Sequence, residues 1–82
     1  MVIAEFDDNF KKLFSKLKDP HVKEKTIKQI EKLKDNPEIG KPMQYGRKRT
    51  KEVYLGSVHL SYAYIKEENK IIFLDLYHKD EQ

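Results

Sequence analysis

Two helices are predicted by the hydrophobic pattern of the first half of the chain. Phe10, Leu13, Phe14 and Leu17 fall at i, i+3, i+4 and i+7, the spacing of one apolar helix face, and Asp7 and Asp8 precede them as helix caps. A second helix is expected to begin at Asp19-Pro20 and to end at Asn36-Pro37. Its expected buried stripe is Val22, Thr26, Ile27, Ile30 and Leu33. A tight turn joins the two, so we expect an antiparallel helix hairpin.

Strands are predicted before and after this hairpin. The segment 2–6 is short and rich in strand-forming residues, and beyond residue 51 the pattern indicates strands at 52–55, 58–65 and 70–77. A turn is expected at Gly56-Ser57, and the loop 67–69 should place Asn69 in the left-handed conformation that asparagine tolerates.

The register of the last two strands follows from a three-residue loop. It would pair Ile65 with Ile71 and, farther along, His59 with Tyr77. The core face would then hold Leu60, Tyr62, Tyr64, Ile72, Leu74 and Leu76. The open face would hold His59, Ser61, Ala63, Phe73, Asp75 and Tyr77.

The element order β-α-α-β-β-β predicts an α+β fold: a small, antiparallel-rich sheet with the helix hairpin packed on one face. With 82 residues, we expect one domain spanning 1–82.

Composition excludes several classes of protein. The chain has no Cys, which rules out disulfides, a thiolate metal site and a cysteine nucleophile. No apolar run approaches the roughly 20 residues that cross a bilayer, and the first residues lack the features of a signal peptide. We therefore expect a cytoplasmic protein without membrane contact.

Positive charge is concentrated between Lys41 and Lys51. The chain carries +3 overall, and this segment holds five basic residues and no acid, so it carries +5 and the rest carries −2. Such a basic segment is typical of proteins that bind a partner bearing phosphate groups. The alternative is a solvated basic loop without a partner.

Imidazole, phenol and ammonium groups gather at one end of the predicted sheet, without a paired carboxylate. They are His59, Tyr77, His78 and Lys79, with the basic segment nearby. This set suits metal-free RNA cleavage, in which the 2′-hydroxyl attacks the adjacent phosphorus while protein groups move protons and stabilise charge. The alternative is a structural hydrogen-bonded His59 and a solvated His78. The histidines lack metal-ligand spacing and there is no glycine-rich phosphate loop, so we expect no metal and no cofactor.

Several segments together resemble the RelE/ParE superfamily of type II toxins, in its RelE-like branch. These are Asn9-Phe10-Lys11-Lys12, the stretch 30–42 with its "NPEIGKP", the segments 52–56 and 61–64, and the tail 77–81.

The resemblance implies the fold described above, of the microbial ribonuclease type, and a toxin held inactive by an antitoxin. RelE-like members cleave mRNA in the ribosomal A site without metal, so the implied activity is a ribosome-dependent mRNA endoribonuclease that inhibits translation. The implied partners are a RelB-like antitoxin, the ribosome and mRNA, with a higher-order toxin–antitoxin complex. Two alternatives remain: a non-catalytic ribosome- or RNA-binding module, and a ParE-like inhibitor of DNA gyrase.

The resemblance also assigns residues to roles. The expected catalytic residues are His59, Tyr77, His78 and Lys79; the expected RNA- and phosphate-binding residues are Arg47, Lys48, Arg49, Lys51 and Tyr54. His59 and Tyr54 stand where RelE-like enzymes often carry arginine. The departure at His59 implies either a shift toward acid–base chemistry or a weakened enzyme.

Overall fold

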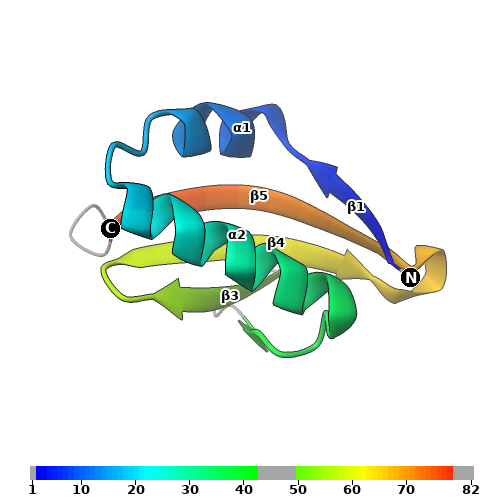
Figure 1. Cartoon of the computed structure of the whole chain (residues 1–82). Helices are drawn as coiled ribbons and strands as arrows, with labels where there is room; N and C mark the ends of the chain where they lie inside the picture. Colours follow the sequence, from blue (N-terminus) through cyan, green and yellow to red (C-terminus); the bar gives the residue numbers. More distant parts are fainter. Residues whose placement is uncertain (1, 43–49, 79–82) are drawn as a thin grey trace.

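The computed structural model describes residues 2–42 and 50–78, and it shows one sheet with two helices on one face (Figure 1). The strand order is β1-β5-β4-β3-β2. Strand β1 (Ile3–Phe6) runs parallel to β5 (Lys70–His78), and the other pairs are antiparallel. The predicted α+β architecture is confirmed. A two-residue strand, β2 (Lys41–Pro42), was not expected; it pairs with the start of β3 (Thr50–Leu55).

Both helices begin at the predicted caps. The Asp7 carboxylate accepts the Asn9 backbone N–H at 2.9 Å and starts α1 (Asp8–Ser15). The Asp19 carboxylate accepts the His21 N–H at 2.9 Å and starts α2 (Pro20–Asp35), with Pro20 at the first helical position. In each case the side chain satisfies an N–H group that the helix itself leaves without a partner.

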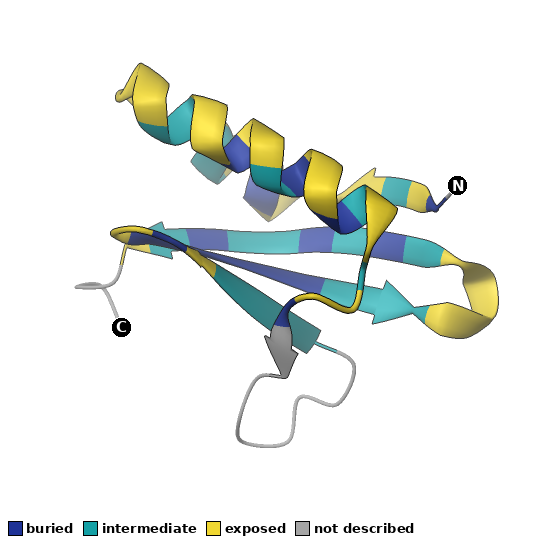
Figure 2. Cartoon of the chain, turned by 60° about the horizontal axis from the view of Figure 1, so that its bottom comes forward, coloured by how far each residue is buried: buried dark blue, intermediate teal, exposed yellow. Residues whose placement is uncertain are grey.

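The core lies between the helices and the sheet. Figure 2 shows the buried positions of α2 turned toward the sheet and its exposed positions turned away. Thr26, Ile30 and Leu33 are buried, whereas Ile27 is 50% exposed, so its predicted place in the core is wrong. The buried positions fall at i, i+4 and i+7, a narrow stripe, and Ile27 lies at its flank.

The register of β4 (Val58–Ile65) and β5 is confirmed at one end and wrong at the other. His59 pairs with Tyr77 and Ser61 with Asp75 as predicted, but Tyr62 pairs with Phe73. The hairpin loop has four residues, because a single 3₁₀ turn, η1 (Lys66–Glu68), precedes Asn69 and Ile65 pairs with Lys70. Asn69 adopts the predicted left-handed conformation, with φ 50°.

A β-bulge between the two registers reverses the faces of β5. Leu74 is the extra residue, so Ile71 and Phe73 point into the core and are fully buried, while Ile72 and Leu74 are only half-buried. The predicted faces of Phe73, Ile72 and Leu74 are therefore wrong. A bulge adds one residue to one strand and shifts the alternation beyond it, which the two-residue period alone does not reveal.

A buried tyrosine joins the segment after α2 to the sheet. The Tyr62 hydroxyl donates to the Pro37 carbonyl at 2.7 Å and accepts the Gly40 N–H at 2.9 Å. Tyr62 is fully buried on the helix-covered face of β4.

Within the described residues, neither helix has the length and apolar character needed to cross a membrane.

Candidate functional site

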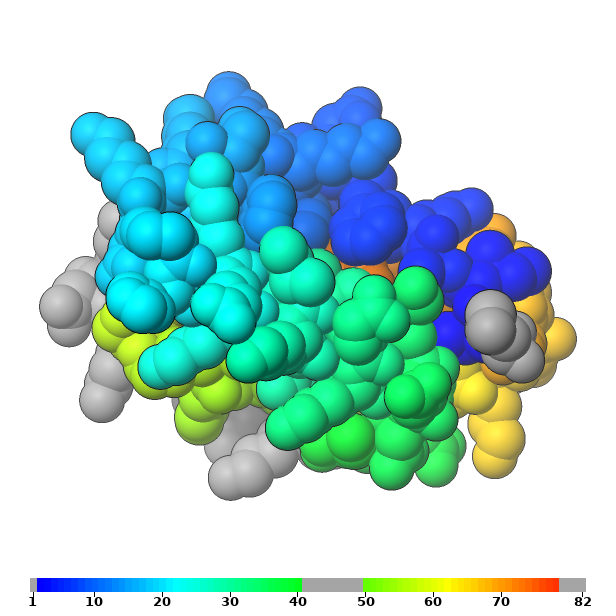
Figure 3. All heavy atoms as spheres, viewed as in Figure 1, coloured from blue at the N-terminus to red at the C-terminus, as the bar shows by residue number. Residues whose placement is uncertain are grey.

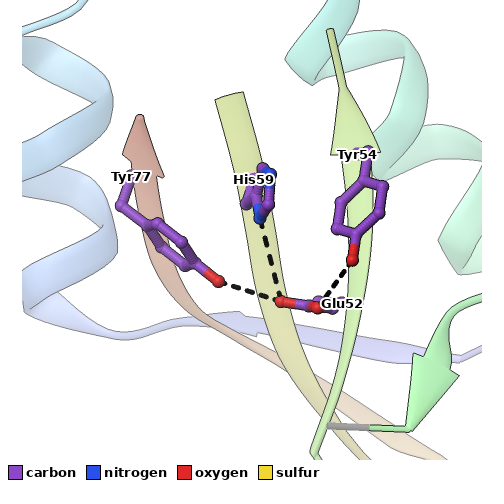
Figure 4. Close-up of polar contacts among 4 residues, drawn as sticks. All are labelled: Glu52, Tyr54, His59 and Tyr77. Atoms are coloured by element: carbon purple, nitrogen blue, oxygen red, sulfur yellow. Dashed lines mark hydrogen bonds and ion pairs between the residues drawn. The ribbon is translucent and has the colours of Figure 1, made fainter. Parts of the chain in front are cut away.

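Strand pairing brings four polar side chains together on the face of the sheet that the helices leave uncovered. The two-residue turn at Gly56-Ser57, with Gly56 at φ 80°, pairs Tyr54 with His59. His59 in turn pairs with Tyr77 on β5. Alternation along β3 places Glu52 on the same face as Tyr54, so three adjacent strands contribute to one cluster (Figure 4).

The carboxylate of Glu52 lies at the centre of this cluster. The Tyr77 hydroxyl donates to Oε2 at 2.9 Å, and the Tyr54 hydroxyl donates to Oε1 at 3.2 Å. His59 Nδ1 lies 4.0 Å from Oε2, a distance at which a protonated imidazole and a carboxylate attract each other (Figure 4). Glu52 therefore organises both phenols and the imidazole.

The imidazole of His59 lies between two aromatic rings. Its centroid is 4.2 Å from the ring of Tyr54 and 5.2 Å from that of Tyr77. His59 is 6% exposed, whereas Tyr54 is 57% exposed. Tyr54 is therefore the member of the cluster that a ligand meets first.

Burial and the Glu52 carboxylate change the acidity of the phenols. Burial, followed by the hydrogen bond to Glu52, raises the pKa of Tyr77 to about 12. The hydrogen bond to Glu52 also raises the pKa of Tyr54 above its ordinary value. Both phenols remain protonated near neutral pH, so they serve as hydrogen-bond donors and not as bases.

Solved structures resemble this chain, whereas no family model and no curated protein matches it. A chain of the intact E. coli RelBE toxin–antitoxin complex superimposes with a TM-score of 0.83 at 22% identity, over 95% of this chain and 96% of that chain. The isolated E. coli RelE toxin gives 0.82 at 20% identity, over 95% and 84%. A chain of the RelBE2 toxin–antitoxin complex from Mycobacterium tuberculosis gives 0.82 at 20% identity, over 95% and 98%. The chain has the RelE fold. These comparisons confirm the fold that the sequence resemblance implied.

On this RelE fold, Glu52 corrects the expectation that no carboxylate accompanies the imidazole. It lies 4.0 Å from His59, in the centre of the cluster. A signal for it was present in the sequence, because a two-residue turn at Gly56-Ser57 already sets the pairing of the two flanking strands. Glu52 lies two residues before Tyr54 in the same strand, so the alternation of side chains places both on the same face.

The structure brings together three of the residues predicted from the sequence: His59, Tyr77 and Tyr54. It does not bring the other two described ones into the cluster. Lys51 pairs with Tyr62, which places it on the helix-covered face, and His78 is exposed at the end of β5, next to Tyr77 and on the opposite face. The remaining predicted residues lie outside the described residues: Arg47, Lys48, Arg49 and Lys79.

Proposed function

We propose that this chain is the toxin of a toxin–antitoxin pair and that it cleaves mRNA on the ribosome, without a metal ion. The observation that carries the proposal is the Glu52–His59 pair beside an exposed aromatic ring, on the uncovered face of a RelE fold. Groups that exchange protons and stack bases are the ones that metal-free RNA cleavage requires. Action on the ribosome would place the protein in the cytoplasm.

In the proposed reaction the RNA supplies its own nucleophile. The 2′-oxygen forms a bond to the adjacent phosphorus, and the bond from phosphorus to the 5′-oxygen of the next nucleotide breaks. His59 accepts the proton of the 2′-hydroxyl, and Glu52, 4.0 Å away, stabilises the imidazolium that forms. Tyr77 holds the carboxylate in place through its 2.9 Å hydrogen bond.

Two further roles fall to residues assigned from the sequence. The leaving 5′-oxygen needs a proton from a second donor, for which Lys79 is proposed, because His78 lies on the opposite face of β5 from the cluster. Negative charge at phosphorus needs cations, for which Arg47, Lys48 and Arg49 are proposed, because Lys51 lies on the helix-covered face. Lys48 and Arg49 immediately precede β3, the strand that carries Glu52.

A second candidate function is a non-catalytic module that binds RNA or the ribosome. The burial of His59 favours it, since a buried imidazole beside a hydrogen-bonded carboxylate also stabilises a fold without reacting. On this interpretation Tyr54, which is 57% exposed, would still contact RNA.

Primer extension on ribosome-bound mRNA separates these functions. We expect cuts at A-site codons with the purified chain and none on naked mRNA. We expect His59→Ala to slow cutting by roughly 10²–10⁴-fold, the usual contribution of a general base. His21→Ala is the matched control, because this exposed histidine of α2 lies outside the cluster, and it should cut like the wild-type chain. Intact mRNA with folded wild-type chain would contradict the nuclease and favour the binding module.

The proposed antitoxin needs a surface to bind, and an apolar groove of about 340 Å³ provides one. It lies between α1, α2 and the end of β1, and Figure 3 shows it as a hollow between the blue atoms of α1 and the teal atoms of α2. Its lining is Phe6, Phe10, Phe14, Ile27 and Ile30, with Lys11 and Glu31.

The net charge of the helical segment that forms the groove indicates the chemistry of that partner. Residues 8–35, which include both helices, contain nine basic and five acidic residues and so carry +4. We propose that the groove takes one amphipathic helix of the antitoxin, with apolar residues on one side and acidic residues on its flanks. Apolar burial would supply affinity, and opposite charge would select this partner.

A further inference from the structure

In the described part of the chain, the end of β5 that carries Tyr77 has no strand on its outer side. Strand β1 pairs with β5 only as far as Phe73, and the chain then turns into α1. Beyond that point the Leu76 N–H donates to Oδ1 of Asp75, its neighbour in the strand, at 2.8 Å. A half-buried carboxylate therefore takes the place that a strand partner would have for this N–H group.

Asn9, in the first turn of α1, contacts the same part of β5. Its side-chain amide donates to the Leu74 carbonyl and to Asp75 Oδ1, each at 3.4 Å, which is long for a hydrogen bond. Leu74 is the extra residue of the β-bulge. The side chains of Asp75 and Asn9 thus bond the backbone directly at the bulge.

The bulge decides which side chain of β5 faces His59. If the register of the hairpin end continued along the strand without an extra residue, His59 would pair with Leu76. Tyr77 would then turn to the helix-covered face. The extra residue places Tyr77 opposite His59 instead, with its hydroxyl pointing at the Glu52 carboxylate (Figure 4).

We propose that Asp75 is a positioning residue of the site. By bonding the Leu76 N–H it holds the bulged register, and that register places Tyr77 against Glu52. The inference rests on the proposed function, in which Tyr77 holds the Glu52 carboxylate in place, and it adds a residue that acts through Tyr77.

Asp75 provides both a hydrogen bond and a charge, and one substitution separates them. Burial raises the pKa of Tyr77 to about 12, followed by the hydrogen bond and charge of Glu52, and the negative charge of Asp75 adds to these causes. Asp75→Asn keeps an oxygen that accepts the Leu76 N–H but removes the charge, whereas Asp75→Ala removes both. If the hydrogen bond positions Tyr77, only the alanine variant should disturb the site.

The contact between the His59 and Tyr77 rings reports the position of Tyr77 without any cleavage. Their centroids are 5.2 Å apart, so NMR cross-relaxation between the ring protons measures this contact in the full chain. We expect the contact in the wild-type chain and in Asp75→Asn, and its loss in Asp75→Ala. Asp35→Ala is the matched control, because Asp35 is exposed at the end of α2, and it should keep the contact.

Cleavage of ribosome-bound mRNA should follow the same order. Asp75→Ala should cut up to roughly 10²-fold more slowly, the effect of a misplacement of about 1 Å, whereas Asp75→Asn should cut like the wild-type chain. If Asp75→Ala does not fold, Asn9→Ala takes its place, and it should weaken the ring contact.

Two results would overturn the inference: an unchanged ring contact in the alanine variant that folds, or an equal loss of contact in Asp75→Asn and Asp75→Ala. Loss of the contact in Asp75→Ala, together with ribosomal mRNA that the wild-type chain leaves uncut, would contradict the nuclease alone. Cleavage by the wild-type chain, together with an unchanged contact in Asp75→Ala, would contradict the positioning role alone.

Discussion

Removing the hydroxyl of Tyr62 tests how the segment after α2 is attached to the sheet. In the structure this hydroxyl makes two hydrogen bonds across the core, one to the Pro37 carbonyl and one from the Gly40 N–H. Tyr62→Phe deletes both and leaves the ring, which is fully buried, in place. The substitution therefore isolates the polar contribution from the packing contribution.

The expected loss of stability follows from those two bonds. Each intramolecular hydrogen bond contributes about 0.5–1.5 kcal/mol net, and a buried group left without a partner costs more than a bond exchanged with water. We expect Tyr62→Phe to lower the free energy of unfolding by about 2 kcal/mol. For a domain of this size, each kcal/mol shifts Tm by about 4–8 °C, so the melting temperature should fall by about 8–16 °C.

Urea denaturation followed by circular dichroism measures this difference, and Tyr64→Phe is the control. Tyr64 is a half-buried tyrosine of the same strand and makes no side-chain hydrogen bond to any described residue, so its loss of a hydroxyl should change stability by less than about 0.5 kcal/mol. Equal stabilities of the two variants would show that the Tyr62 hydroxyl does not hold this segment, and the reasoning would be refuted.

Gly40 extends the same argument to packing. A Cβ built on Gly40 would lie 2.5 Å from Tyr62 Oη and 2.9 Å from Tyr62 Cε1. Gly40→Ala should therefore force the buried ring to move and should be more destabilising than Tyr62→Phe. Because both residues share one contact, the effects of the two substitutions should not add in the double variant.

Two further predictions concern the cluster and the groove. The pKa of Tyr77, raised to about 12 from an ordinary 10.0, means that its neutral phenol stabilises the fold fully below pH 10 and loses this effect as pH rises through about 12. Glu52→Gln should lower that pKa without abolishing the shift, since burial remains; an unchanged tyrosinate absorbance titration would contradict the assigned hydrogen bond. In the groove, Ile27→Asp should weaken binding to a co-expressed acidic protein from the neighbouring gene by at least about tenfold. Ile39→Asp, outside the groove, should not, and equal weakening in a calorimetric titration would refute the groove as the binding surface.

Short-range sequence signals were sufficient to predict where the helices begin and that His59 pairs with Tyr77. The aspartates at 7 and 19 each satisfy a backbone N–H within two residues, so the caps needed no tertiary information. The pairing of His59 with Tyr77 was also predicted, although the loop length behind it was wrong. The extra loop residue shifts the register by one, and the bulge shifts it back between Tyr62 and Ser61. The register error is therefore confined to the part of β5 next to the hairpin loop.

Sequence alone therefore supplied the residue types available for chemistry, and it determined the helix caps, the α+β class and the order of the elements apart from β2, because these depend mainly on residues close in the chain. Only the tertiary structure decided that Phe73 faces the core and that Glu52 accepts hydrogen bonds from Tyr54 and Tyr77. The bulge at Leu74 and the pairing of three strands bring residues 25 positions apart into hydrogen-bond distance. Such contacts depend on register, and one inserted residue exchanges the two faces of a strand without changing its composition.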